Sequence, residues 1–159
     1  MSTKKLSNKH LPYKILMQGK GSSQARQLEK FKTDIDSVIL GTGTYWEGIN
    51  VEGEALSQVI IFKLPFPVTD PIIDYKMSLA EDRVIDVAVP EMIIKLQQGA
   101  GRLIRSSSDK GIVSILDPRA SSREHKPYRD TILNALCEKQ STEDIAELTT
   151  FWSRIKEVM

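Results

Sequence analysis

Residues 13–41 read YKILMQGKGSSQARQLEKFKTDIDSVILG, and this stretch decides the class of fold. Two short runs rich in Ile, Val and Leu, Tyr13–Gln18 and Ser37–Gly41, are typical of strands buried on both faces, as in parallel sheets. Between them, Ser23–Lys32 repeats apolar residues at helical spacing, which predicts a helix. The repeated residues are Ala25, Leu28 and Phe31. A strand, a helix and a strand in this order indicate an α/β layered domain.

The same alternation continues downstream. Gln58–Leu64 and Gly111–Asp117 predict two more buried strands. The helical patterns that alternate with the strands are Asp70–Glu81, Glu91–Ser106 with Pro90 in its first turn, Pro127–Glu138 and Thr142–Val158. The fold class is therefore predicted to be α/β, a parallel sheet flanked by helices with a helical pair in residues 120–159. Apolar residues of the last helix, beginning with Ile145, are interpreted as core.

The beginning of the chain does not fit this pattern. Residues 1–12 are polar, and we expect a frayed start there. A domain of this kind should open with a strand, so its first strand–helix unit is expected to be missing. With 159 residues, the chain is long enough for one core, and residues 1–159 are predicted to form a single domain.

Composition narrows the class of protein. Hydrophobic residues make up 40% and charged residues 27%, and the net charge is +1. This balance is typical of globular domains, and it neither favours nor excludes a nucleic-acid partner, because a cleft needs only local positive charge. A single cysteine excludes an internal disulfide and an iron–sulfur cluster held by several cysteines. Without a membrane-spanning run or a secretory signal, we expect a cytoplasmic protein.

The predicted helix Glu91–Ser106 carries the most informative polar residues. At about 100° per residue, Gln98, Arg102 and Arg105 fall within one narrow sector. The opposite side of this helix consists of Met92, Leu96, Ala100 and Leu103. Two arginines one turn apart repel each other unless an anion lies between them, and guanidinium groups suit phosphate. Exposed arginines paired with nearby acids are the alternative interpretation.

Glycines within this predicted helix favour the first interpretation. Each of Gly99 and Gly101 weakens a helix interior by roughly 1 kcal/mol. Two glycines in one helix indicate that another backbone or a ligand approaches closely.

The string Gln98-Gly-Ala-Gly-Arg-Leu-Ile-Arg105 resembles the sixth motif of superfamily-two helicases. The resemblance implies that Arg105 is the arginine finger, that Arg102 helps to hold the phosphates, and that Gln98 lies near the nucleotide. The predicted strand that follows and ends in Asp117-Pro-Arg119 is similar to the corresponding segment of the DinG/XPD branch, a strand that leads into aspartate-x-arginine. In that branch, such a segment belongs to the second RecA-like domain.

The string Gly41-Thr-Gly-Thr-Tyr-Trp-Glu-Gly-Ile-Asn50 follows an apolar strand. A turn rich in glycine and hydroxyl groups can offer donors to phosphate oxygens, and the alternative is a tight loop with Trp46 as a core anchor. The string resembles the fifth helicase motif of the DinG branch. The resemblance places Thr42 and Thr44 on DNA, and it places Glu47, Gly48 and Asn50 nearer the nucleotide. Asn50 stands where the family has an aspartate; it can hydrogen-bond a ribose hydroxyl but carries no charge.

Two shorter segments agree with this branch. Gln18-Gly-Lys-Gly21 resembles its glutamine–glycine turn, which implies DNA contacts for Gln18 and Lys20. Lys63-Leu-Pro-Phe-Pro67 resembles its lysine–leucine–proline–phenylalanine segment, which implies DNA contacts for Lys63 and Phe66. A solvated lysine and a core phenylalanine are the ordinary alternatives. Stacking of Phe66 on a base would contribute roughly 1–3 kcal/mol.

The chain carries no Gly-x-x-x-x-Gly-Lys-Ser/Thr loop and no Asp-Glu-x-His box. In the family, these elements lie on the first RecA-like domain, which makes most of the contacts to ATP and Mg²⁺. The resemblance therefore implies a C-terminal motor domain that works with the first domain, in cis or in trans, on single-stranded DNA. We expect it to be inactive alone.

Two other readings compete with this one. The first is a non-catalytic DNA- or protein-binding module derived from a helicase, favoured by the open edge of an incomplete sheet. The second is another nucleotide-using α/β enzyme, such as a transferase. No dinucleotide fingerprint or paired nucleophile supports the second reading, and His10 and His125 are interpreted as surface residues.

Overall fold

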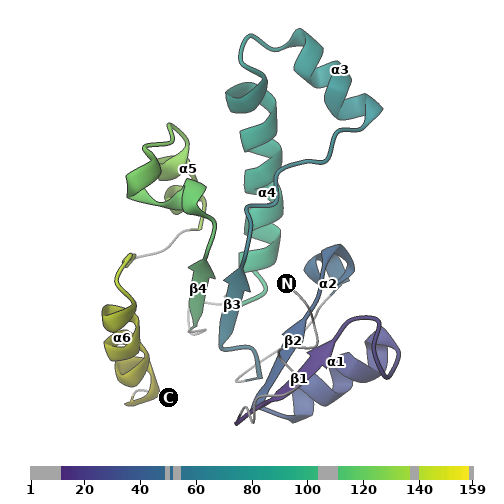
Figure 1. Ribbon diagram of the computed structural model, residues 1–159, viewed down its shortest axis with the longest axis vertical. Helices are drawn as coiled ribbons and strands as arrows, with labels where there is room; N and C mark the ends of the chain where they lie inside the picture. The colour runs from purple at the N-terminus through teal and green to yellow at the C-terminus, as the bar shows by residue number, and fades with distance from the viewer. Residues whose placement is uncertain (1–11, 49–50, 52–54, 104–110, 137–139, 158–159) are drawn as a thin grey trace. The chain divides into compact units, whose positions relative to one another are not determined.

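The computed structural model describes residues 12–48, 51, 55–103, 111–136 and 140–157 (Figure 1). These residues belong to two compact units, 1–56 and 57–159, and each unit is considered by itself. Both units combine parallel strands with helices, which confirms the predicted α/β class. The assignment of residues 1–159 to a single domain stays a prediction.

The first unit is the predicted strand–helix–strand segment. Strand β1, Lys14–Met17, pairs in parallel with strand β2, Ser37–Leu40, and Met17 lies opposite Leu40. Helix α1, Gln24–Thr33, connects the strands and packs on both. The Ser23 side chain accepts a hydrogen bond from the Arg26 N–H at 3.4 Å and so caps α1. A short helix α2, Gly43–Gly48, follows β2.

The buried face of α1 differs from the predicted one. Phe31 is buried as expected, but Ala25 is exposed, and the polar Gln27 is only 2% exposed. Gln27 and Phe31 are four residues apart and therefore share one face of the helix. Gln27 is tolerated inside because its polar atoms have hydrogen-bond partners.

The second unit contains the other two strands. Strand β3, Gln58–Ile61, pairs in parallel with strand β4, Ile112–Ile115, and Ile61 lies opposite Ile115. The prediction of burial on both faces is wrong for β3, since Ile61 is 2% exposed whereas Ile60 is 48% exposed. Successive side chains of a strand point to opposite faces, so one face of β3 lies in the core and the other is open.

One helical segment dominates the second unit (Figure 1). Helix α3, Pro71–Leu79, begins after Asp70, which accepts from two N–H groups of its first turn at 2.8 and 2.9 Å. A π-helix, Arg83–Ala88, then continues directly into helix α4, Val89–Ala100. The predicted helix therefore begins earlier than expected. The wide π turn suits Pro90, which has no amide hydrogen and would crowd a carbonyl four residues back.

The core of the second unit lies beneath α4. Met92 and Leu96 of α4 are completely buried, as is Ile132 of helix α5, Arg129–Ala135. The Gln97 side chain donates to the Ala135 carbonyl at 3.0 Å and links the two helices. Short 3₁₀ turns at Pro118–Ala120 and Ser122–Glu124 connect β4 to α5.

The last helix, α6, spans Ile145–Glu157. The prediction that Ile145 is core is wrong, because this residue is 82% exposed in the first turn of a helix whose start is open to solvent. Within the described residues, none of the helices has the length and apolar character needed to span a membrane.

Candidate functional site

The end of α4 differs from the predicted continuous helix through Arg105. The helix ends at Ala100, and the Arg102 and Leu103 N–H groups bond to carbonyls three residues back at 3.4 and 2.9 Å. Arg102 therefore lies in a turn after the helix, and the prediction that it shares one helix with Gln98 is wrong. Arg105 lies outside the described residues.

Glycine explains why the helix ends there. Gly101 donates to the Gln97 carbonyl at 2.8 Å, and a Cβ at Gly101 would lie 2.8 Å from that same oxygen. The close approach inferred from the two glycines is thus made, at Gly101, by the backbone of the helix itself. A turn this tight excludes an ordinary side chain at Gly101 without a shift of the backbone.

Other expectations for α4 are confirmed. Met92, Leu96, Ala100 and Leu103 are all buried. Gln98 is exposed on the other side, and Arg102 is half-buried with an interaction partner in the protein. The helix is therefore anchored by one face and presents its carboxamide near its C-terminal end.

In the first unit, two segments predicted to contact DNA meet directly. The Gln18 Oε1 atom accepts from the Thr42 N–H at 2.8 Å and from the Thr42 hydroxyl at 3.0 Å. Gln18 follows β1 and Thr42 follows β2, so the contact lies at the shared carboxyl edge of two parallel strands. Lys20 is exposed in the turn between β1 and α1.

Gln27 was not identified from the sequence, although it organises this turn. Its Nε2 donates to the carbonyls of Met17 at 2.8 Å, Lys20 at 2.6 Å and Ser22 at 3.2 Å. Its Oε1 accepts from the Tyr45 hydroxyl at 2.9 Å. In the sequence, the one indication that Gln27 is buried is its position four residues before Phe31, which places it on the face of the helix that covers the strands.

The Gly41–Asn50 string is not the irregular turn that was expected. It includes α2, in which Thr44, Glu47 and Gly48 lie, because residues 43–48 take up helical hydrogen bonding after β2. The core anchor is Tyr45, 5% exposed, rather than Trp46, which is half-buried. The side chains of Thr44 and Glu47, and all of Asn50, lie outside what the structure describes.

In the second unit, Asp117 organises the segments that follow β3 and β4. It is buried, and its Oδ2 accepts from the Leu64 N–H at 2.9 Å. Arg119 donates to both carboxylate oxygens, from its backbone N–H to Oδ1 at 3.0 Å, from Nε to Oδ1 at 3.0 Å and to Oδ2 at 3.2 Å, and from Nη2 to Oδ2 at 2.6 Å. The Arg119 guanidinium, together with the Leu64 and Arg119 N–H groups, lowers the pKa of Asp117 to about 2 against the opposing effect of burial.

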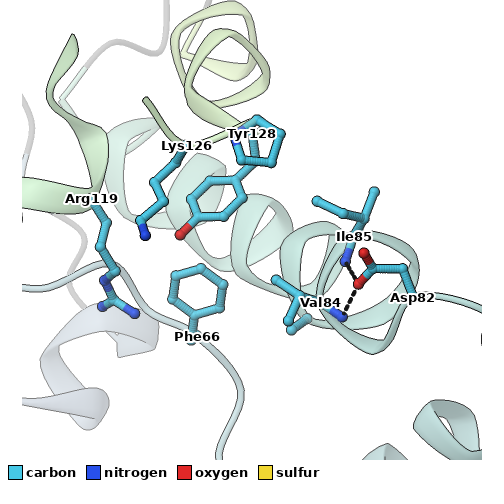
Figure 2. Close-up of a pocket in the computed structure, with 9 residues that line it drawn as sticks. Phe66, Asp82, Val84, Ile85, Arg119, Lys126 and Tyr128 are labelled. Carbon is cyan, nitrogen blue, oxygen red and sulfur yellow. Dashed lines mark hydrogen bonds between the residues drawn. The ribbon is translucent and has the colours of Figure 1, made fainter. Parts of the chain in front are cut away.

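Arg119 in turn covers Phe66. Its guanidinium carbon lies 4.6 Å from the centre of the Phe66 ring, and the Tyr128 ring packs edge-on against Phe66 with centres 5.8 Å apart. Figure 2 shows these groups around an open pocket of about 480 Å³, with Lys126 beside Tyr128 and an apolar wall from the π-helix. Phe66 is half-buried and Lys63 is exposed. Any base that stacks on Phe66 must therefore use ring surface that Arg119 does not cover.

Groups of three or more metal-ligating side chains were not found among the described residues. His125 is exposed, as expected of a surface residue. His10 lies outside the described residues.

Comparison with known proteins adds the family context. A family model described as the helicase C-terminal domain matches residues 1–139. The chain is 39% identical over 142 residues to the ATP-dependent DNA helicase YoaA of Haemophilus influenzae and 37% identical to the YoaA of Escherichia coli. It is 36% identical over 141 residues to the 3′-5′ exonuclease DinG of Bacillus subtilis. These matches cover 86%, 86% and 85% of the chain but only 22%, 22% and 14% of the relatives.

Proposed function

The chain belongs to the helicase C-terminal domain family, and on this premise we propose that it is the second motor domain of an ATP-dependent DNA helicase. It spans about a fifth or less of the length of the curated relatives it matches, so a first RecA-like domain in cis or in trans completes the proposed motor. The proposed setting is the cytoplasm, where bacterial DNA is found.

For the ATP site, we propose that Arg105 stabilises the negative charge on the transferring phosphoryl group and that Arg102 helps to hold the phosphates. Gln98, Glu47, Gly48 and Asn50 are proposed to lie near the nucleotide. The exposure of Gln98 on an anchored helix supports this assignment, because a contact to a nucleotide held by another domain must face outward. Mg²⁺, which neutralises phosphate charge when bound, is assigned to the first domain.

For DNA, the observation that carries the proposal is the contact between Gln18 and Thr42. It joins two segments that are far apart in sequence and that are both predicted to contact single-stranded DNA. Lys20 and Lys63 are exposed and can neutralise backbone phosphates, and Thr44 and Phe66 extend the proposed track. Backbone contacts of this kind grip a strand without reading its sequence.

The proposed cycle follows from these two sites. ATP binds between the two motor domains, and the arginines of this chain close on it. Closure and reopening then move the track formed by Gln18, Lys20 and Thr42 along the strand. The chain alone is proposed to hydrolyse no ATP at a meaningful rate, because its sequence carries no phosphate loop.

The test adds a first RecA-like domain from a relative in trans and measures ATPase activity with and without single-stranded DNA. We expect DNA-stimulated turnover that falls by orders of magnitude in Arg105→Ala. Lys95→Ala, on the same helix as Gln98, serves as a matched loss of positive charge and should retain turnover. Saturable turnover by the chain alone that Arg105→Ala abolishes would refute the proposed division of labour.

One observation favours the alternative of a non-catalytic binding module. Ile60 and Phe62, in and just after β3, are 48% and 66% exposed, and exposed apolar side chains of this kind can be covered by a partner. The same experiment separates the two readings. DNA affinity without rescue of ATPase activity would support the binding module.

A further inference from the structure

Gln27 and Asp117 are the buried polar side chains of the described residues. Asp117 pairs with Arg119 in the second unit. The Gln27 side chain bonds within the first unit, both to the turn proposed to contact DNA and to Tyr45 of α2. An amide taken out of water without partners is costly, so its bonds specify one arrangement of the groups around it.

The chemistry at this position calls for a carboxamide. Three carbonyl oxygens lie within 3.2 Å of Nε2 and need a donor, while the Tyr45 hydroxyl, 2.9 Å from Oε1, needs an acceptor. Glutamate cannot donate, and methionine of similar size does neither. The donor and acceptor of Gln27 therefore connect the turn after β1 to α2 with no net charge.

The first group of bonds fixes the turn that contains Lys20. The bonded carbonyls flank Gly19 and Gly21, whose φ angles of 78° and 82° are in the left-handed region that favours glycine. In a trans peptide the N–H points away from the C=O, so drawing the Lys20 carbonyl inward turns the Gly21 N–H outward. The turn thus leaves Lys20 exposed, and it directs the neighbouring Gly21 N–H away from Gln27.

The bond from the Tyr45 hydroxyl to Gln27 fixes α2 and the residues that precede it. Gly41 allows the Tyr45 ring to approach the backbone, because a Cβ at Gly41 would lie 2.5 Å from the ring. With Tyr45 held, the preceding Thr42 is placed for its two bonds to Gln18. Gln27, Tyr45, Thr42 and Gln18 therefore form a circuit across the ends of β1 and β2. The Tyr45 N–H donates to the Thr42 carbonyl at 2.8 Å, and the chain itself joins Gln18 to Met17, whose carbonyl accepts from Gln27.

We infer that Gln27 is a positioning residue of the single-stranded DNA track, acting through the turn at Lys20 and through Thr42. This inference rests on the proposed function. Gln27 itself does not contact DNA, since it is 2% exposed.

The experiment measures binding of the purified chain to fluorescein-labelled oligo(dT) by anisotropy over a series of salt concentrations. Gln27→Met and Gln27→Glu should each weaken binding by about tenfold and make the salt dependence shallower by about one released counterion, as expected when one phosphate contact is lost. Ile132→Val, in the core of the second unit, is the matched control that lowers Tm without altering affinity or salt slope.

A double-mutant cycle distinguishes positioning from loss of stability. Lys20→Ala should weaken binding in the parent chain but have little further effect in Gln27→Met, because the turn no longer presents that lysine. If Gln27→Met does not fold, Tyr45→Phe removes one bond of the circuit, keeps the ring, and should show the same loss of coupling in smaller degree.

The outcomes are separable. Unchanged affinity in the Gln27 variants, or an equal effect of Lys20→Ala in both backgrounds, would overturn the inference while leaving the track intact. Failure of the parent chain to bind oligo(dT) would instead overturn the proposed track, and the positioning role with it.

Discussion

Each unit of this chain uses one buried polar side chain to join the segments that follow two parallel strands. In the first unit the neutral Gln27 bonds to the carbonyl of Met17, the last residue of β1, and to Tyr45 after β2. In the second unit the charged Asp117, after β4, bonds to the Leu64 N–H after β3 and to Arg119. Both clusters connect the ends of two neighbouring parallel strands, the first through a neutral amide and the second through a charged carboxylate.

The difference teaches what charge adds. A carboxylate offers two charged oxygens to a guanidinium, and the Arg119 held in this way lies over Phe66. A buried ion depends on its partner and on pH, whereas the neutral amide depends on its hydrogen-bond partners alone. The predictions below test this contrast, beginning with the largest effect.

The largest expected effect is that of Asp117→Ala. It leaves the Leu64 N–H without its acceptor and Arg119 without its carboxylate, so we expect the free energy of unfolding to fall by about 3 kcal/mol. Urea denaturation measures this loss. Asp130→Ala removes an exposed carboxylate 3.5 Å from Arg129 and is the matched control, with almost no expected change. Equal losses in the two variants would show that burial is irrelevant to the charged cluster.

Acid should weaken the Asp117 cluster and not the Gln27 cluster. The pKa of Asp117 is lowered from its ordinary value of 3.8 to about 2 in the folded protein, so its contribution is fully present above the unfolded pKa and is lost as pH falls through about 2. We expect about 2 kcal/mol of acid-dependent stability that Asp117→Asn removes, measured by urea titrations between pH 5 and pH 2.

The pKa of Glu143 is also lowered to about 2, chiefly by the Ser122 N–H. Protonation of Glu143 in acid therefore also lowers the stability of the fold. Both titrations are therefore compared in a Glu143→Gln background. An Asp117→Asn variant that keeps the full acid sensitivity of that background would contradict the assignment.

A smaller effect is expected for Tyr45→Phe. The variant removes one neutral hydrogen bond to Gln27 and keeps the buried ring, so the free energy of unfolding should fall by about 1 kcal/mol. The removed bond accepts at an amide oxygen rather than at a carboxylate, so the loss should be the same at pH 5 and pH 8. A loss that varies with pH would show that the stability of the Gln27 cluster depends on pH, as that of the Asp117 cluster does.

The smallest effect is expected for Asp34→Asn. Asp34 pairs with Lys14 at 2.6 Å at the surface of the first unit, and the Lys14 bond lowers the pKa of Asp34. Exposed pairs are screened by salt, so the change should be undetectable in thermal unfolding at moderate salt and small at low salt. A clear loss of Tm at moderate salt would show that charge also matters in this unit.

Periodicity predicted much of the fold. The four strands of the described residues lie inside the predicted runs, and α1 and α3 begin one residue after the predicted starts at Ser23 and Asp70. Met92 and Leu96 are buried on α4 while Gln98 is exposed. Such features depend on neighbours within one or two turns of the chain. The proposed roles of Arg105 and Asn50 stay predictions, since both lie outside the described residues.

Periodicity failed where a polar group is buried or a helix ends. It selected Ala25 rather than Gln27 for the core of α1, and it carried the α4 helix past Gly101. A polar side chain is buried only where hydrogen-bond partners are available. The partners of Gln27 and Asp117 lie up to 18 and 53 residues away in the sequence. The spacing of apolar residues carries no information about such partners.

The sequence by itself determined the alternation of strands and helices, the apolar faces and the helicase motifs, because each is written in residues that are close together along the chain. Only the tertiary structure decided which polar side chains go inside, that Tyr45 rather than Trp46 anchors α2, and that Gln18 meets Thr42. These outcomes depend on hydrogen bonds between distant segments, whose free energy is gained only once the strands have paired.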